Sequence, residues 1–189
     1  MSSKPSMPAS LPAVIGTPMQ LAFVPKDFDA ALEHWTQAMG VGPFFVIEEV
    51  ALDNMTYRGS PCDCRFKLAL GYWGDMQIEL IEWLSGNRAI YGDPWLPGNG
   101  AVHHTCILTE DLARAREAFA AAGSEVLVTG DVGEDGGVFY ADTGPARSRP
   151  HAGGIVEVLQ PASGALDVFA MIRDAARDWD GRDPVRSLA

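Results

Sequence analysis

Residues 19–28 read MQLAFVPKDF, and residues 103–112 read HHTCILTEDL. Each stretch is a short apolar segment that leads into an aspartate, a common residue at the start of a helix. When the two stretches are aligned, Gln20 falls on His104, 84 residues further along the chain, and the two aspartates coincide as well. The same succession of elements therefore begins twice, which indicates an internal repeat.

The patterns that follow the two aspartates agree with this repeat. Apolar side chains recur there at three- and four-residue spacing, as an amphipathic helix requires, and Gly40 and Gly123 end the two helices. Strands are then expected at residues 44–50, 55–58, 65–72 and 77–82 in the first half, and at 125–128, 137–142 and 155–160 in the second. The closing strands, 77–82 and 155–160, align once a six-residue difference in loop length is allowed.

The chain is therefore expected to be an α+β protein built from two βαβββ modules. We place the modules at residues 18–86 and 101–162, joined by a Gly- and Pro-containing linker at 87–100. Residues 1–17, rich in Ser, Pro and Ala, are expected to form a flexible lead, and residues 163–189 a C-terminal helix and tail.

Two glutamates stand at equivalent positions of the closing strands. Side chains alternate between the two faces of a strand, so Glu79 and Glu157 each lie on an otherwise largely buried strand. A buried carboxylate costs free energy unless it is paired or coordinates a metal ion. Gln20 and His104 are equivalent on the first strands of the two modules, so these four side chains can meet at one cation.

This ordered set resembles the vicinal oxygen chelate superfamily, which includes glyoxalase I, methylmalonyl-CoA epimerase, extradiol dioxygenases and bleomycin-resistance proteins. The resemblance covers roughly residues 19–161, and residues 40–45, GVGPFF, are similar to a phrase frequent in a bacterial glyoxalase-like subgroup. It implies that the two βαβββ modules form a cupped mixed sheet around one metal ion. The ligands that it implies are Gln20, Glu79, His104 and Glu157.

The implied ligand set limits the metal and the chemistry. One histidine and three oxygen donors suit a divalent ion, and zinc, nickel, cobalt, manganese and magnesium all remain open. A six-coordinate ion would keep two positions for a substrate with two neighbouring oxygens, and would act as a Lewis acid while a proton leaves the α-carbon. By analogy with glyoxalase I, Glu157 is the expected base, with Glu79 as the alternative.

Three functions remain open at this point. The favoured one is a metal-dependent isomerase, epimerase or lyase that moves a proton next to a carbonyl. The second is a resistance-type protein that binds a small molecule without catalysis, although such a protein does not require the buried carboxylates. The third is an Fe(II) extradiol dioxygenase, which is less favoured because Gln20 replaces the second histidine that this chemistry prefers.

Other polar residues near the expected site have simpler interpretations. His103 is expected on the face opposite His104, with a structural role or an exposed position. His151 lies in a Gly-, Pro- and Arg-rich loop and is expected to be solvated. The alternative is that this loop forms a lid, in which Arg147 or Arg149 grips an anionic group of the substrate.

Composition excludes several partners. The formal net charge of −11 argues against nucleic acid and against anionic membranes, and no apolar run approaches the roughly 20 residues of a membrane span. Three cysteines suggest reduced thiols and a cytoplasmic setting. The expected partners are a small-molecule substrate and a second copy of the chain in a homodimer, since members of the resembled superfamily often pair their modules across subunits.

Overall fold

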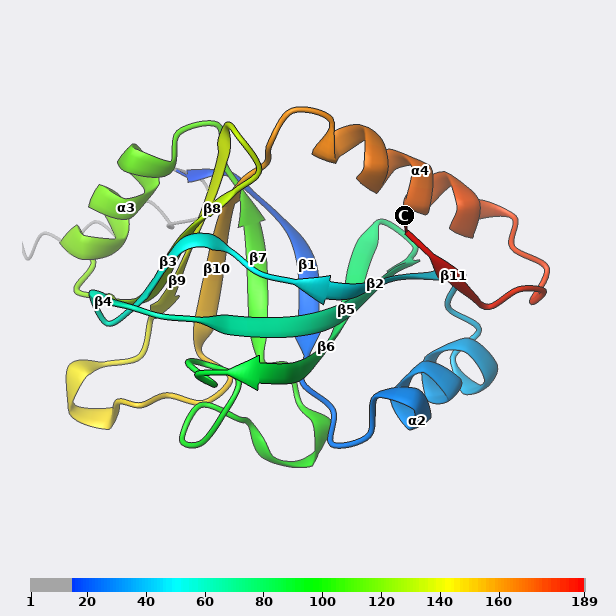
Figure 1. Ribbon diagram of the computed structural model, residues 1–189, viewed down its shortest axis with the longest axis horizontal. Coiled ribbons are helices and arrows are strands. Elements are labelled where there is room, and N and C mark those ends of the chain that lie inside the picture. The colour runs from blue at the N-terminus through cyan, green and yellow to red at the C-terminus, as the bar shows by residue number, and fades with distance from the viewer. Residues whose placement is uncertain (1–14, 189) are drawn as a thin grey trace, which may run out of the picture.

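The computed structural model describes residues 15–188, so the lead predicted at residues 1–17 lies mostly outside the described part (Figure 1). The strands are β1 (Thr17–Phe23), β2 (Phe44–Val50), β3 (Asp53–Tyr57), β4 (Ser60–Pro61), β5 (Cys64–Trp73), β6 (Met76–Gly86), β7 (His104–Leu108), β8 (Glu125–Val132), β9 (Gly136–Asp142), β10 (Ile155–Gln160) and β11 (Val185–Ser187). The helices are α2 (Phe28–Glu33), which continues as a π-helical segment (His34–Ala38), α3 (Leu112–Ala121) and α4 (Ala165–Arg177). No helix among the described residues is long and apolar enough to cross a membrane.

These strands form one sheet in the order β11-β2-β5-β6-β1-β7-β10-β9-β8-β3-β4. At its centre β1 and β7 pair antiparallel, and each is flanked by the parallel closing strand of its own module, β6 or β10. The order β1-β6-β5-β2 on one side is repeated on the other as β7-β10-β9-β8. In Figure 1, β2 and β5 pass in front of β1, β7 and β10, so the sheet curls around an inner face. The predicted α+β fold, with two βαβββ modules in a cupped mixed sheet, is confirmed.

The outer face of the sheet is covered by one helix from each module. Phe28 of α2 packs in a cluster with Ile78 and Leu80 of β6. In the second module, Phe119 of α3 meets Phe139 of β9 edge to face, with ring centroids 5.4 Å apart. Because side chains alternate along a strand, the apolar residues of β6 that face α2 leave Glu79 on the opposite, inner face.

The two predicted helix starts are capped by aspartates as the repeat requires. Oδ1 of Asp27 accepts a hydrogen bond from the Ala30 amide, and Oδ1 of Asp111 accepts one from the Arg114 amide, each at 2.9 Å. Such caps satisfy amide groups that a helix leaves unpaired at its first turn. The first helix changes character after Glu33, where the π-helical segment begins. There the Thr36 hydroxyl donates to the Leu32 carbonyl at 2.7 Å, a bond of the kind that bends helices.

The inner face holds the larger apolar cluster, which two distant segments of the chain cover. Ile172 of α4 is fully buried in this cluster, and Val168 and Phe169 pack against it. Ile90 and Trp95, from the segment between β6 and β7, are buried in the same cluster. The predicted tail helix and the linker therefore both enclose the inner face.

Replacing Ile172 with alanine is expected to lower the free energy of unfolding by about 2–5 kcal/mol, because it opens a cavity at a fully buried position. The neighbouring Met171 is 42% exposed, so Met171→Ala should change this free energy by less than about 0.5 kcal/mol. Urea unfolding of the parent and both variants measures the difference. Equal losses from the two substitutions would contradict the packing of α4 on the inner cluster.

The strand predicted at residues 55–58 has a partner that the sequence patterns did not indicate. It forms β3, which pairs antiparallel with β8 of the second module, with Tyr57 opposite Val128. The hydroxyls of Thr56 and Thr129 lie 2.8 Å apart across this pair. β3 thus connects the two modules at the far end of the sheet from β2.

Candidate metal centre

Three of the four predicted ligands meet on the inner face. Glu79 of β6, His104 of β7 and Glu157 of β10 each offer one ligand atom, and these atoms all lie within 4.8 Å of one another. Nε2 of His104 is 3.0 Å from Oε2 of Glu157 and 3.5 Å from Oε2 of Glu79. All three side chains are buried, with exposed fractions of 8%, 0% and 7% in chain order. All three side chains belong to one chain.

The strand register explains how side chains from non-adjacent strands meet. Ala22 of β1 is the Cα partner of both Glu79 and His104, so it lies between them on the inner face. Strands two places apart in a sheet are separated by roughly 10 Å, and a large side chain at the intervening position would keep the two groups apart. The methyl group of Ala22 leaves room for them. The sequence did not indicate a role for Ala22, because that role depends on the pairing of β1 with β7 of the other module.

Gln20 lies on the same face, one row further along the sheet. Its Cα partners are Gln77 of β6 and Cys106 of β7, and Cys106 in turn pairs with Glu157. The Gln20 amide nitrogen donates to the Gln77 side-chain oxygen at 2.6 Å. This bond involves the side-chain nitrogen of Gln20. A cation would instead be bound by the side-chain oxygen of Gln20. Gln20 as a fourth ligand stays a prediction.

The protonation of the cluster follows from its burial and its charges. Burial acts to lower the pKa of His104, but the hydrogen bonds and charges of Glu157 and Glu79 outweigh it and raise this pKa to about 9. Burial raises the pKa of Glu79, with a contribution from the charge of Glu157, while His104 acts in the opposite direction. His104 therefore holds a proton at neutral pH in the metal-free cluster.

The charge balance shows that the donor set fits a divalent cation. Two ionised carboxylates and an imidazolium leave one uncompensated negative charge in a buried place, which is costly. Two carboxylates, a neutral imidazole and a divalent cation leave none. The atoms are also those that zinc and its neighbours in the first transition series bind, one imidazole nitrogen with carboxylate oxygens.

Two buried tyrosines lie close to the cluster. The ring of Tyr140 on β9 meets the ring of His104 edge to face, with centroids 5.3 Å apart. Tyr91, from the segment between β6 and β7, lies against His103 with centroids 5.7 Å apart. Burial, followed by the charges of the two glutamates, raises the pKa of both phenols well above the usual value. Both hydroxyls therefore stay protonated at neutral pH.

The predicted orientation of His103 is wrong. This residue is fully buried, and its Nδ1 lies 2.9 Å from Nδ1 of His104. β7 begins at His104, so the alternation of a strand does not extend back to His103. Its Nε2 lies 2.8 Å from the carbonyl oxygen of Ile90, in the segment that covers the inner face.

The Arg-rich loop between β9 and β10 makes its described contacts away from the cluster. The guanidinium of Arg149 donates to the carbonyls of Gly144 and Gly123, the latter just after α3. His151 is exposed, and its backbone amide donates to Oδ2 of Asp142 at 3.0 Å. These bonds fix the loop to its own module. The lid in which Arg147 or Arg149 grips a substrate gains no support from them.

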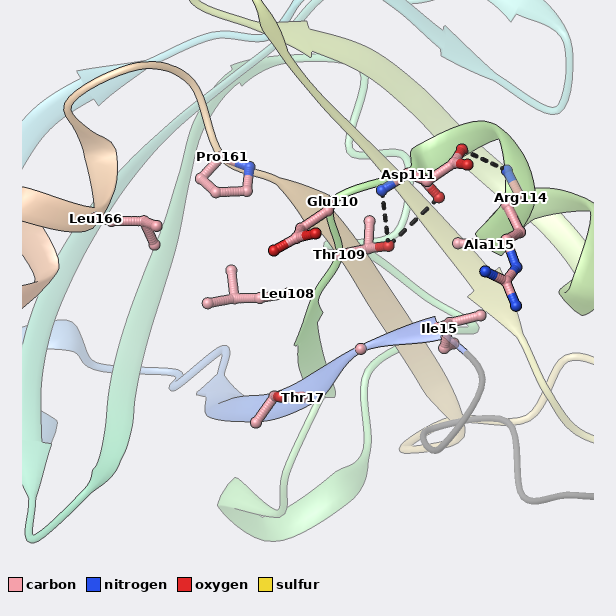
Figure 2. A pocket seen from close by; sticks show the side chains of 11 residues that line it. Ile15, Thr17, Leu108, Thr109, Glu110, Asp111, Arg114, Ala115, Pro161 and Leu166 are labelled. Atoms are coloured by element: carbon pink, nitrogen blue, oxygen red, sulfur yellow. Dashed lines mark hydrogen bonds between the residues drawn. The ribbon is translucent and has the colours of Figure 1, made fainter.

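A separate pocket of about 480 Å³ opens beside α3 (Figure 2). It lies between the start of β1, the end of β7 and the first turn of the helix. Two of its polar residues are occupied with the helix start, since Thr109 and Asp111 bond to each other and Asp111 caps the Arg114 amide. The residues of the Glu–His–Glu cluster do not line this pocket, so it is distinct from the candidate metal centre.

Paired βαβββ modules with a buried Glu–His–Glu cluster on their central strands define a protein of the vicinal oxygen chelate class. Residues 19–141 match the family model of the Glyoxalase/Bleomycin resistance protein/Dioxygenase superfamily. The chain belongs to this superfamily.

One solved structure shares this fold, and two others show a weaker likeness to it. Methylmalonyl-CoA epimerase from Mycobacterium tuberculosis is 16% identical, with 86% of this chain and 97% of that chain covered and a TM-score of 0.53. A hypothetical protein from Bacillus halodurans C-125 is 15% identical, with 77% and 94% covered and a TM-score of 0.49. A Streptomyces coelicolor methylmalonyl-CoA epimerase variant in complex with 2-nitronate-propionyl-CoA is 14% identical, with 79% and 99% covered and a TM-score of 0.47. A comparison with curated protein sequences finds no match.

Proposed function

We propose that the protein is a metal-dependent isomerase, epimerase or lyase that transfers a proton next to a carbonyl of a small, oxygen-chelating substrate. The charge balance of the buried cluster carries this proposal. Glu79, His104 and Glu157 are neutralised by one divalent cation but not by a proton on the histidine. A protein that only sequesters an apolar molecule gains nothing from this arrangement.

The proposed ligands are Glu79, His104 and Glu157, with the amide oxygen of Gln20 as the fourth. Zinc, nickel, cobalt, manganese and magnesium are the candidate ions. When bound, the cation would supply a Lewis acid that stabilises the negative charge developing on a substrate oxygen. His104 would have to be neutral to serve as a ligand, so binding of the cation releases the proton that the imidazole otherwise holds.

The two carboxylates are proposed to handle the substrate proton. Glu157 reaches the cluster from β10 and Glu79 from β6, on either side of the central β1–β7 pair. A carbon whose proton is removed and returned on the same side needs one base, Glu157 in our assignment. An epimerisation needs a second group on the other face of the carbon, and we propose Glu79 for this role. Burial raises the pKa of Glu79, which makes it a stronger base.

The surroundings of the cluster suit a reaction that must exclude water. Tyr91 and Trp95 come from the segment that covers the inner face, and Trp95 is held there by a 2.9 Å hydrogen bond from its Nε1 to the Tyr57 hydroxyl. A dry site strengthens the electrostatic contacts made with a developing oxyanion. The protonated phenol of Tyr91 could donate a hydrogen bond to such an oxygen.

For the substrate we propose only chemical classes, and for the assembly only a dimer of identical chains. The fold likeness to the Mycobacterium tuberculosis epimerase supports testing 2-acyl thioesters beside α-hydroxyketones. We further propose a cytoplasmic homodimer acting on a small molecule. The free thiols of the cysteines at positions 62, 64 and 106 agree with a reducing compartment.

A non-catalytic binding protein is the second candidate. The aromatic and apolar lining of the inner face, which includes Phe66, Tyr91 and Trp95, favours it because such walls suit an apolar ligand. An extradiol dioxygenase ranks below both, because the described cluster holds one histidine where that chemistry prefers two.

Metal content tests the proposal directly. Protein purified without chelators or a metal-affinity tag is expected to carry close to one divalent ion per chain, measured by elemental mass spectrometry. Glu157→Ala should lose this ion, because it removes a ligand and unbalances the buried charge. Glu82→Ala is the matched control, since Glu82 lies on β6 but is exposed. A parent that is free of metal and takes up none of the five candidate ions would leave the binding protein as the better description.

A further inference from the structure

His103 connects the candidate metal centre to the segment that covers it. Nδ1 of His103 lies 2.9 Å from Nδ1 of His104. On the other side of the ring, Nε2 of His103 lies 2.8 Å from the carbonyl oxygen of Ile90. All three residues are fully buried. Their hydrogen bonds therefore form in the protein interior, without competition from water, and such bonds are stronger there than in water.

The direction of these hydrogen bonds follows from the chemistry of their ends. A carbonyl oxygen accepts but cannot donate, so Nε2 of His103 must carry the proton that points at Ile90. The ring is fully buried and its described contacts are with an imidazole and a carbonyl, not with a carboxylate, so it is neutral and carries one proton in all. Nδ1 of His103 is then an acceptor, and the proton between the two rings belongs to Nδ1 of His104.

This assignment determines which nitrogen of His104 is free to bind a cation. A neutral imidazole with its proton on Nδ1 has its lone pair on Nε2, the atom that faces Glu79 and Glu157. We propose that His103 is a positioning residue that fixes the Nδ1-protonated tautomer of His104 and so directs Nε2 to the metal ion. The inference rests on the proposed metal centre.

The acceptor at the far end belongs to the covering segment and not to the sheet. The backbone at Ile90 is held by the burial of its side chain and by a 2.7 Å bond from the Tyr91 amide to the Arg88 carbonyl. The Tyr91 ring lies against His103, which limits rotation of that ring. The His103 side chain thereby couples the orientation of His104 to the position of the segment that covers the inner face.

Two substitutions at position 103 separate positioning from packing. His103→Phe keeps an aromatic ring but removes both hydrogen bonds. His103→Gln keeps them in the same direction, because its amide oxygen can accept from His104 and its amide nitrogen can donate to the Ile90 carbonyl. If the role is positioning, zinc affinity should fall about 10–100-fold in the phenylalanine variant and largely recover in the glutamine variant. Competition with a chromophoric zinc chelator measures the affinities, and urea unfolding of the metal-free proteins shows whether each variant is folded.

Imidazole nitrogen NMR of the zinc-loaded parent provides a readout that does not depend on any variant. The expected result is a protonated Nε2 and unprotonated Nδ1 on His103, with the proton on Nδ1 and zinc on Nε2 of His104. A proton on Nδ1 of His103, or unchanged zinc affinity in a folded His103→Phe, would overturn the positioning role while leaving the metal centre standing. A parent that binds no zinc or other candidate ion would overturn the proposed centre itself, and His103 with it.

Discussion

Replacing Glu157 with glutamine is expected to slow exchange of the α-proton of at least one substrate enantiomer with solvent by about 10²–10⁴-fold, the usual contribution of a general base. Glutamine keeps the shape and one oxygen of the side chain but cannot accept a proton at neutral pH. The carboxylate that it replaces lies within 3.0 Å of His104 in a buried cluster, so no nearby water can readily substitute as base. Deuterium uptake from D₂O into a panel of α-hydroxyketones and 2-acyl thioesters, followed by mass spectrometry, measures the rate.

Metal occupancy must be matched before the rates are compared, since Glu157 is also a proposed ligand. Each variant is therefore assayed with the ion saturated and its content measured. Glu79→Gln distinguishes the two proton-transfer schemes. With two bases, each variant should still exchange the proton of one substrate enantiomer while losing interconversion of the two. If Glu157 is the single base, Glu79→Gln should exchange the α-proton at the parental rate. Exchange at the parental rate in metal-loaded Glu157→Gln would remove this residue from the proton transfer.

Much of the candidate metal centre could be predicted because its signals are local. Glu79 and Glu157 are charged residues that alternate with apolar ones on short strands, and the repeat places them at equivalent positions. His104 emerged in the same way, from its alignment with Gln20. These features depend on periodicity and order along the chain, and the cluster of three follows from them.

The parts that escaped prediction depend on which strands become neighbours. Ala22 matters because it lies between Glu79 and His104 in the paired sheet, a relation that its own strand does not encode. His103 was placed on the wrong face because strand alternation was applied one residue before β7 begins. Gln20 was predicted as a ligand from its alignment with His104 and from the family resemblance, while its side chain bonds to Gln77 on the adjacent strand.

The same limit applies to the larger elements. β3 pairs with β8 from the other module, a contact between residues far apart in sequence. The tail helix was predicted from its apolar spacing, but that pattern could not show that Ile172 would be buried on the inner face. The residues that enclose the cluster were therefore harder to anticipate than the residues that form it.

The affinity for a divalent cation is expected to rise about tenfold for each pH unit as the pH approaches about 9 from below, and to level off above that pH. The reason is the proton held by His104, whose pKa is about 9 beside Glu157 and Glu79 against 6.5 in the unfolded chain. Below pH 9 the cation must displace this proton, so each bound ion releases about one proton at pH 7. Calorimetric titrations in buffers of different ionisation enthalpy count the released proton directly.

The same proton links the stability of the metal-free protein to pH, with the opposite sign. Because the folded state raises the pKa of His104, its contribution to stability is fully present below pH 6.5 and is lost as pH rises through about 9. Metal-free protein should therefore unfold at lower urea concentration at pH 9.5 than at pH 6.5. His104→Gln, which has no titrating ring, should lose most of this difference. The opposite result would be that neither the metal affinity nor the stability of the metal-free protein changes across this pH range. His104 would then hold no such proton, and the charge balance that favours a divalent cation would be wrong.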